Sequence, residues 1–510
     1  MTSFAELRAH RSQFHFSLSE LLKHDPDRAA FKLKNVIHSH TLNYDFSKTH
    51  LNAESLELFE SFVEASGLNL ERSRLFSGEH VNCTEDRAAL HTATRTPEAL
   101  NNQLKKMDDF VTQLHHHVWK GSTDQPIVDV VNLGIGGSDL GPRFVADALY
   151  HFHQKTIRCH FVANVDPEEL SEILSTLNPE TTLFILASKS FSTQETLFNA
   201  ELAKLWLREH LKTSFKAERH FVAITSNLQK AQDFGIDPEH CFEISEAIGG
   251  RYSLWSNMGL SIAIQIGMDH FKALLLGAHA MDEHFKTQPT LKNIPVMMAL
   301  VSLWYRNFWA AQSYAILPYS RRLQHFPAYL QQLEMESLGK SVLKTGQPSP
   351  HQTGGVIWGG VGTNGQHAFH QLLHQGTLLI PADFITIQQP SYSEDLSSAM
   401  KQQWITQHQV LVKHAHAQRQ ALLQGKTREE AEIELKKAGK TASEISFLAP
   451  HKMIPGNRPS IEISLNTLDP FNLGQLIAAY EHKIFALSVF LNINPFDQFG
   501  VELGKALASD

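Results

Sequence analysis

The segment PIVDVVNLGIGGSDLGP, residues 126–142, decides the fold class of this chain. It starts as an apolar, β-branched run, passes through closely spaced glycines and continues into RFVADALYHF, which has a helical pattern. An apolar run that ends in glycines before a helix is typical of a buried strand in a parallel sheet. The segment therefore predicts an α/β protein.

The same alternation continues toward the C-terminus. The runs IRCHFVANV, TTLFILAS and HFVAITS are predicted strands, and ETLFNAELAKLWLREHL is a predicted helix between the last two. Further along, GGVIWGGVG, TLLIPADFITI and IEISL are predicted strands as well. Strands that alternate with helices predict doubly wound parallel sheets, and ligands of such sheets bind beyond the carboxyl ends of the strands.

A polar segment, residues 281–295, contains two prolines, so we expect it to connect two α/β units. At 510 residues the chain is also too long for one ordinary core. We therefore predict a mainly helical N-terminal extension over residues 1–120 and a first α/β domain over residues 121–285. A second α/β domain with a C-terminal arm is predicted over residues 286–510.

The composition indicates a globular protein and argues against some kinds of partner. Apolar residues make up 42% of the chain and charged residues 19%. The formal net charge is -8 and neither end carries a basic run, so we expect neither nucleic acid nor an acidic membrane as the main partner. An anionic small substrate remains compatible with this balance, because a few local donors can outweigh it.

The cysteines and the apolar runs predict the compartment. Cys83, Cys159 and Cys241 are far apart and form no CxxC pair, so we expect neither a disulfide framework nor a structural zinc site. The N-terminus lacks the apolar core of a signal peptide, and the most apolar run, Ile294–Tyr305, is too short to span a bilayer. We expect a cytoplasmic protein without a membrane segment.

Two loops that each follow a strand and open a helix are candidate anion sites. In NLGIGGSDLGP, residues 132–142, glycines let backbone amides approach a ligand closely. Asp139 stands where the dinucleotide fingerprint needs its third glycine, and no Gly-Lys-Ser/Thr follows, so neither that fingerprint nor a Walker loop is present. The alternative is a tight turn between strand and helix.

The second loop, SKSFSTQET, residues 188–196, crowds hydroxyls and one lysine at a helix N-terminus, which suits a phosphate monoester. The alternative is a capping box formed by Ser192 and Glu195. A capping box would not require the lysine or the first two serines. Two such loops in one α/β unit favour a phosphate site.

Two further motifs carry charge. In GGRYSLWSNMGL, residues 249–260, Arg251 supplies a permanent charge with forked donors, or it is a structural arginine at a helix start. In QQLEMESLGK, residues 331–340, Glu334 and Glu336 lie two residues apart and do not share a helix face. We therefore expect only one of these glutamates to point into a given cleft, the alternative being a surface acidic turn.

The segment WGGVGTNGQHAFHQLLHQGT, residues 358–377, places His367 near a helix start. His370 and His374 have the i,i+4 spacing of a zinc site, but Gln371 stands where a metalloprotease needs a glutamate, so we expect no metal. The last motif, NPFDQFGVELGK, ends in Lys505. Its apolar residues predict a docked C-terminus, and they are Phe496, Phe499, Val501 and Leu503.

Five of these segments together resemble the glucose-6-phosphate isomerase family closely, in the family's order, from about Pro126 to Lys505. They are GIGGSDLGP, GGRYSLWS, MESLGK, GTNGQHAF and GVELGK. The resemblance implies two sugar-isomerase (SIS-type) α/β domains, with N- and C-terminal extensions that embrace a second subunit. It also implies a homodimer, reversible isomerisation of D-glucose 6-phosphate to D-fructose 6-phosphate in glycolysis and gluconeogenesis, and no cofactor.

The resemblance also implies the roles of individual residues. Glu336 is the base that moves a proton between sugar carbons 1 and 2, and Arg251 stabilises the enediolate. His367, which comes from the neighbouring subunit in the family, opens the ring with help from Lys505. The implied substrate-binding residues are Gly137, Ser138, Ser188, Lys189 through its backbone, Ser190, Thr193, Gln332 and Gln498.

Physical chemistry supports these roles separately. Isomerisation needs one carboxylate that alternates as base and acid, and a fixed positive charge that cannot be lost, which suits arginine. Ring opening needs a proton donor near neutral pH, which suits histidine. No redox change occurs, so no nicotinamide is needed, in agreement with the missing dinucleotide fingerprint.

The chain departs from the family pattern at a few positions. The family's SKTFTT is SKSFST here, which keeps the hydroxyls, and Phe499 replaces a tryptophan. Leu338 replaces the asparagine of MESNGK, which could change the support behind Glu336. Alternatives for the function are an isomerase that also accepts mannose 6-phosphate, a non-catalytic sugar-phosphate-binding regulator and an extracellular signalling role.

Overall fold

A computed structural model describes residues 3–25, 28, 31–102, 104–392 and 395–508. The chain divides into two compact units that interleave along the sequence. Unit 1 comprises residues 1–70, 283–468 and 482–493, and unit 2 comprises residues 71–282, 469–481 and 494–510. The three-part division at residues 120 and 285 stays a prediction.

Unit 2 is built on a parallel sheet of five described strands, in the order β4-β3-β5-β6-β7. The strands are β3 (Asp129–Leu133), β4 (Arg158–Val162), β5 (Thr182–Ala187), β6 (Phe221–Thr225) and β7 (Cys241–Glu243). Counted along the chain, this order is 2-1-3-4-5, so the direction of winding changes between β3 and β5. Crevices at such a switch point are the usual ligand sites of open α/β sheets.

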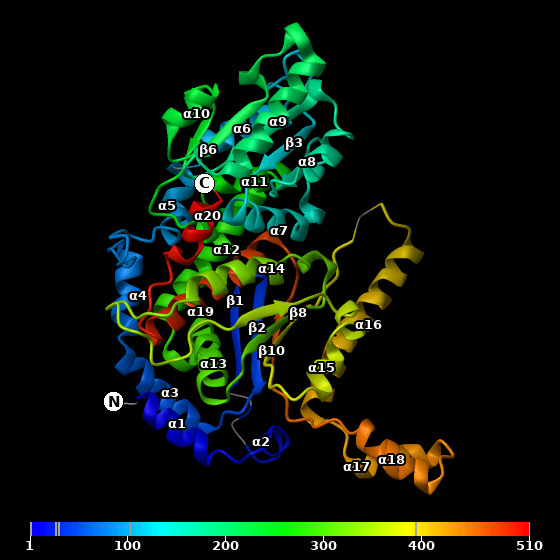
Figure 1. The fold of residues 1–510 in the computed structure, drawn as a ribbon. Coiled ribbons are helices and arrows are strands. Elements are labelled where there is room, and N and C mark those ends of the chain that lie inside the picture. Colours follow the sequence, from blue (N-terminus) through cyan, green and yellow to red (C-terminus); the bar gives the residue numbers. More distant parts are fainter. Residues whose placement is uncertain (1–2, 26–27, 29–30, 103, 393–394, 509–510) are drawn as a thin grey trace. The chain divides into compact units, whose positions relative to one another are not determined.

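The central strands of unit 2 are buried on both faces. Every residue of β3, β5 and β6 is buried, as expected for strands between two layers of helices. Helices α8, α9 and α10 pack on one face around a core that includes Leu133, Phe184 and Leu207. The helices of this unit include α6 (Lys105–His115), α7 (Leu140–Ala148), α8 (Pro167–Leu174), α9 (Gln194–Leu211), α10 (Leu228–Phe234), α11 (Leu260–Ile266) and α20 (Glu502–Leu507) (Figure 1).

Unit 1 is built on a mixed sheet in the order β1-β2-β11-β10-β8-β9. The strands are β1 (Lys32–Ile37), β2 (His40–Lys48), β8 (Ser313–Pro318), β9 (Val356–Gly359), β10 (Ala382–Ile387) and β11 (Ser460–Leu465). Strands β9, β8, β10 and β11 are parallel, and their order along the chain is again 2-1-3-4. The hairpin β1–β2 continues the sheet in antiparallel fashion from β11.

The helices of unit 1 include two sets. Those near the sheet are α1 (Phe4–Gln13), α2 (Leu18–His24), α3 (Ala53–Ser66), α13 (Ile294–Phe308), α14 (Phe326–Leu330), α15 (His370–Gln375) and α16 (Ser398–Gln424). Helices α17 (Arg428–Lys437) and α18 (Ala442–Lys452) pack on each other around Ala431, Leu435 and Ala449, beyond the end of α16 (Figure 1). Of the remaining helices, α5 (Pro97–Asn102) belongs to unit 2, and three contain residues of both units, namely α4 (Leu68–Ser77), α12 (Met268–Thr287) and α19 (Pro470–Phe490).

The prediction of an α/β fold with parallel sheets and helical extensions is confirmed. The N-terminal part is not helical throughout, because β1 and β2 join the second sheet. The expected connection over residues 281–295 is largely helical: α12 continues to Thr287, and α13 begins at Ile294 with Pro295 in its first turn, where a missing amide proton costs nothing. Within the described ranges, every helix falls short of the length and apolar character that a membrane crossing needs.

Candidate functional site

The glycine loop after β3 lies at the switch point of unit 2. A β-carbon on Gly137 would lie 2.0 Å from the carbonyl oxygen of Gly250, so this loop touches the Gly-Gly-Arg segment through a position that only glycine can occupy. The side-chain amide of Asn132 donates to the carbonyl of Ser138 at 3.0 Å. A β-carbon on Gly134 would lie 3.1 Å from that of Ala187, at the end of β5.

The hydroxyl-rich loop after β5 lies beside it. Ser188 Oγ and Thr193 Oγ1 are 3.1 Å apart, and Ser190 Oγ and Ser192 Oγ are 2.7 Å apart, so the hydroxyls form two close pairs. Phe191 between them is buried and has a φ of 48°, in the left-handed region. The loop therefore curls around an inward-pointing phenylalanine and leaves Ser190 exposed.

The alternative reading of this loop as a capping box is wrong. Helix α9 begins at Gln194, and its N-cap residue is Thr193 rather than Ser192. Within the described chain, the Thr193 side chain accepts no hydrogen bond from the first-turn amides. An uncapped helix N-terminus surrounded by hydroxyls keeps its donors and its positive dipole end available to an anion.

Arg251 is buried and held by the C-terminal part of the chain. Its Nη2 donates to the carbonyls of Pro495 at 2.5 Å and Asp497 at 3.1 Å, and its Nη1 donates to Gln498 Oε1 at 3.1 Å. The turn that carries it, η9 (Gly250–Trp255), is a 3-10 helix. The two sequence-predicted residues Arg251 and Gln498 are therefore direct neighbours.

The other end of η9 is fixed by a buried charge network. Trp255 Nε1 donates to Glu481 Oε1 at 2.7 Å, and Arg95 pairs with both Asp282 and Glu481 at 2.6 Å. Burial raises the pKa of Glu481, although Arg95 opposes that shift. The network makes η9 a rigid support for Arg251.

The prediction of a docked C-terminus is confirmed only for its first residue. Phe496 is buried, but Phe499, Val501 and Leu503 are 51%, 45% and 70% exposed. Lys505 lies on α20 and is exposed as well. The sequence pattern failed here because the spacing of apolar residues shows that a helix has an apolar face. It does not show whether other residues of the same chain bury that face.

In unit 1, the two candidate glutamates lie on a π-helical turn, residues 331–336, directly after α14. Glu334 is buried, and its Oε2 accepts a hydrogen bond from the Lys483 ammonium at 2.8 Å. Glu336 is only partly buried. The two glutamates therefore differ in burial, and the ion pair identifies Glu334 as a structural residue, while the expectation that only one of them faces a cleft stays a prediction. Turns of this kind are frequent at functional sites.

The two glutamines of the same turn differ in their hydrogen bonding. Gln331 Nε2 donates to the carbonyl of Ile357 at 3.1 Å and ties the turn to β9. The Oε1 atom of Gln332 is buried and has no hydrogen-bond partner among the described residues. An unsatisfied buried acceptor lowers the stability of the folded protein by about 1–3 kcal/mol. A ligand that donates a hydrogen bond to this oxygen would therefore be stabilised.

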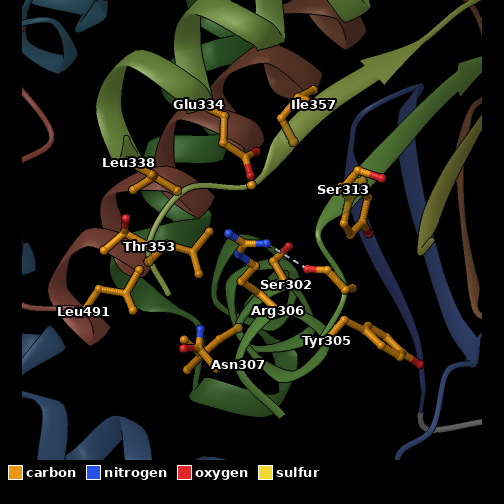
Figure 2. A pocket seen from close by; sticks show the side chains of 15 residues that line it. Ser302, Tyr305, Arg306, Asn307, Ser313, Glu334, Leu338, Thr353, Ile357 and Leu491 are labelled. Atoms are coloured by element: carbon orange, nitrogen blue, oxygen red, sulfur yellow. Dashed lines mark hydrogen bonds between the residues drawn. The ribbon is translucent and has the colours of Figure 1, made fainter. Parts of the chain in front are cut away.

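A small cavity of about 30 Å³ lies behind the turn, between α13, β8 and α19 (Figure 2). Leu338, the residue that departs from the family pattern, points into it together with Glu334 and Thr353. Its side chain is 2% exposed, so the leucine packs into the interior of unit 1. A cavity of this volume holds about two water molecules and is too small for a sugar phosphate.

His367 is exposed on η14 (Asn364–His367), in the loop after the edge strand β9. His370 and His374 do not converge on an empty position between their rings. Both rings contact Oε1 of Gln418 instead, at 3.0 and 2.7 Å. In the described part of the chain, no group of three or more histidine, cysteine or acidic side chains could hold a metal ion.

The structure thus distributes the sequence-predicted residues over both units. Unit 2 brings together the loops with Gly137 and Ser138, with Ser188 to Thr193, and with Arg251 and Gln498, while unit 1 carries Gln332, Glu336 and His367. Lys483 was missed. The signal was available, because Lys483 stands with Glu481 and His482 in the mostly apolar helical run IAAYEHKIFALSVF, where a buried charge needs a partner.

Comparisons with known proteins match the chain over most of its length. A family model described as phosphoglucose isomerase matches residues 45–510. The glucose-6-phosphate isomerase of Ectopseudomonas mendocina (strain ymp) is 47% identical over 525 residues, which cover 100% of this chain and 92% of the relative. The glucose-6-phosphate isomerase of Stutzerimonas stutzeri (strain A1501) is 47% identical over 521 residues, which cover 99% and 92%.

Solved structures show the same relationship. The crystal structure of a glucose-6-phosphate isomerase from Chlamydia trachomatis D/UW-3/Cx has a TM-score of 0.83 and 29% identity, over 100% of this chain and 95% of that one. A hypothetical protein from Thermus thermophilus has a TM-score of 0.65 and 25% identity, over 89% and 97%. The similarity extends along the whole chain rather than to one sheet.

Proposed function

Because this chain belongs to the phosphoglucose isomerase family, we propose that it catalyses the reversible isomerisation of D-glucose 6-phosphate to D-fructose 6-phosphate. The reaction moves one proton between sugar carbons 1 and 2 and consumes no cofactor. The two α/β sheets are then sugar-isomerase (SIS-type) domains, and the chain serves glycolysis and gluconeogenesis.

The observation that carries this proposal is the pair of loops at the switch point of unit 2. The loops after β3 and β5 bring a glycine turn, two pairs of hydroxyls and the uncapped N-terminus of α9 to one edge of the sheet. These are donors suited to a phosphate dianion. The residues that we propose for the phosphate are Gly137, Ser138, Ser188, Lys189 through its backbone, Ser190 and Thr193.

Glu336 is the proposed base and then acid of the proton transfer. It is the partly exposed glutamate of the π-helical turn, whereas Glu334 is committed to Lys483. Arg251 would stabilise the negative charge of the cis-enediolate, since a buried guanidinium held by backbone carbonyls keeps its charge and position. Its fixed geometry is what transition-state stabilisation requires.

Ring opening is assigned to His367, with Lys505 assisting, and sugar hydroxyls to Gln332 and Gln498. The unpartnered Oε1 of Gln332 supports its role, because a hydroxyl donor would satisfy it. His367 and Lys505 are both exposed, so a ligand in solution can reach their side chains.

We further propose that the protein is a homodimer and that His367 completes the site of the partner. Apolar surface is available for such an interface in unit 1, where Met400, Trp404 and Phe447 are 56%, 40% and 70% exposed. Mixing Glu336→Gln with His367→Ala subunits tests this, because hybrid dimers would contain one intact site. Activity near a quarter of wild type would support sharing, and no recovery in proven hybrids would contradict it.

A cytoplasmic location is part of the same proposal. The cysteines Cys83, Cys159 and Cys241 are all free thiols, which fits a reducing compartment. Fractionation of cells that express the untagged chain would test this, and recovery in a secreted fraction would contradict it.

The experiment that tests the function is the initial rate of fructose 6-phosphate conversion with a chelator present. Wild type is expected to be active, and Glu336→Gln is expected to lose a factor of about 10²–10⁴ without a change in melting temperature. Glu334→Gln is the matched control two residues away, and it should lower the melting temperature while the folded fraction stays active. Inactivity of folded wild type would remove the proposal, and an active Glu336→Gln would remove only the assignment of the base.

A further inference from the structure

We propose that Lys189 is a positioning residue whose ammonium fastens the phosphate-binding loop to the segment that carries Arg251. Through this link, occupation of the phosphate site would hold Arg251 in its working position. The inference rests on the proposed function for its catalytic consequence, but the link itself is a statement about unit 2.

The ammonium of Lys189 is engaged by the loop after β7. Its Nζ donates to the carbonyls of Glu246 at 2.7 Å and Ile248 at 3.0 Å. The carbonyl between them, that of Ala247, accepts the amide of Leu90 at 3.0 Å. Three successive carbonyls of this loop are therefore held from outside, and the loop leads within three residues to Arg251.

The backbone of Lys189 is fixed from the other side. Its carbonyl accepts hydrogen bonds from the amide and the hydroxyl of Ser226, both at 2.8 Å, and from the Thr225 hydroxyl at 3.0 Å. Strands β5, β6 and β7 are neighbours in the sheet, so Lys189 reaches from the end of β5 across β6 to the loop after β7. Lys189 therefore links the segments that follow three neighbouring strands.

A lysine in a phosphate loop could instead bind the phosphate directly, but the contacts argue against this for the Lys189 side chain. Two of its three donors already serve carbonyls, and moving it would leave both acceptors unsatisfied. Burial lowers the pKa of this ammonium, and Arg87 lowers it further, while Glu246 and Glu85 oppose the shift. The side chain is thus adapted to a backbone contact rather than to an exposed dianion.

Gly137 provides a second contact to the same segment. Its contact with the Gly250 carbonyl joins the loop after β3 to the same Gly-Gly-Arg segment. The loop after β7 is therefore connected to both phosphate loops, once through a glycine contact and once through the Lys189 ammonium. Binding energy from the phosphate, which does not react, can then be used to position the group that acts on the reacting carbons.

The test compares Lys189→Met with wild type in two measurements. Titration calorimetry with inorganic phosphate is expected to give an affinity within about threefold of wild type, while kcat for isomerisation falls at least about 30-fold. Hydrogen exchange of segment 244–256 should be slowed by phosphate in wild type and no longer slowed in the variant. If Lys189→Met unfolds, Lys189→Gln, whose side chain is shorter and uncharged, carries the same comparison.

Lys204→Met is the matched control. Lys204 also lies in unit 2 and donates to a backbone carbonyl, that of Phe234 at 2.9 Å, but it stands on α9 away from the loops. This variant should keep the phosphate affinity, kcat and the protection of segment 244–256.

Loss of phosphate affinity in Lys189→Met at unchanged kcat would overturn the proposal in favour of direct binding. Unchanged protection of segment 244–256 by phosphate would also overturn it. These outcomes are separable from a failure of the proposed function, because calorimetry and exchange report the link even in a protein that does not isomerise the sugar.

Discussion

Units 1 and 2 contain parallel sheets with the same winding order but use them differently. In unit 2, the predicted phosphate loops flank the switch point between β3 and β5. In unit 1, the equivalent switch point lies between β8 and β10. Glu336 lies in the crossover from β8 to β9, as Gly137 lies in the crossover from β3 to β4, but it follows α14 and does not come directly after the strand, and His367 follows the edge strand β9. The shared topology therefore predicts the location of one half of the functional residues only.

The two units also fix their functional segments by different forces. In unit 2 the loops are held by backbone contacts, namely the Gly137 approach to Gly250 and carbonyls that accept from Lys189 and Arg251. In unit 1 the π-helical turn is held by the buried pair of Glu334 and Lys483. Geometric changes should consequently impair the phosphate loops of unit 2, and loss of the Lys483 charge should impair the turn of unit 1.

The largest expected effect is on unit 1. Lys483→Met leaves the Glu334 carboxylate buried without its partner, and we expect a loss of about 3–5 kcal/mol in unfolding free energy. Urea unfolding followed by circular dichroism measures it. Lys286→Met is the control, because its pair with Glu283 is 2.6 Å long but partly exposed to solvent, and it should cost under about 1 kcal/mol. Equal losses in the two variants would contradict the assignment of a buried electrostatic anchor.

The corresponding change in unit 2 is Gly137→Ala. Its β-carbon would lie 2.0 Å from the Gly250 carbonyl oxygen, so the glycine loop and the Arg251 segment must separate. We expect kcat/KM to fall about 100-fold, because small displacements of a positioned group cost that much. Gly249→Ala, whose β-carbon would lie 3.4 Å from the Tyr252 ring, should stay within about threefold. Steady-state kinetics of both variants tests this prediction. A fully active Gly137→Ala would show that the close contact between Gly137 and Gly250 is not needed for activity.

Acid should weaken unit 1 through buried histidines. Burial lowers the pKa of His50 and of His284 to about 4, and His284 Nε2 accepts the amide of Ile294 at 3.0 Å, which needs a neutral ring. Each pKa is lower in the folded chain, so stability is complete above pH 6.5 and is lost as the pH falls toward 4. We expect about 1 kcal/mol per histidine between about pH 6.5 and 5.5.

The measurement is the urea midpoint at both pH values for wild type and His284→Gln. The variant can still accept the Ile294 amide but cannot titrate, so its midpoint should change less with pH. Identical pH dependence in the two proteins would refute a role for His284.

The smallest effects distinguish the neighbours Gln331 and Gln332. Gln331→Leu removes the hydrogen bond to the Ile357 carbonyl and should cost about 1 kcal/mol of stability. Gln332→Leu removes an unpartnered buried oxygen, so stability should stay equal or rise by up to about 1 kcal/mol, while KM for fructose 6-phosphate increases. Thermal melts together with steady-state kinetics test the pair. A destabilised Gln332→Leu with unchanged KM would remove Gln332 from the proposed site.

Local signals in the sequence predicted the local elements. The apolar run that ends in glycines identified β3 and its turn, and the hydroxyl-rich segment after TTLFILAS identified the loop after β5. These inferences succeeded because backbone freedom, side-chain donors and burial periodicity are properties of a few consecutive residues.

The pairing of strands that are far apart in the sequence was not predicted from local patterns. The hairpin β1–β2 joins β11, which lies more than four hundred residues along the chain from Leu42 (Leu42↔Leu465), and no periodicity connects the two. The C-terminal segment showed the reverse failure, since its apolar residues suggested docking, yet Phe499 and Leu503 remain exposed. Strand β8, at the centre of the second switch point, was not anticipated either.

The sequence by itself determined the α/β class and the composition of the loops that we propose for the phosphate, because each depends on a short stretch of chain. Only the tertiary structure decided which strands are neighbours, that Lys483 pairs with Glu334, and that Lys189 reaches the loop before Arg251. These depend on contacts between residues far apart in sequence, and a contact of that kind is selected by the packing of the whole unit rather than by local pattern.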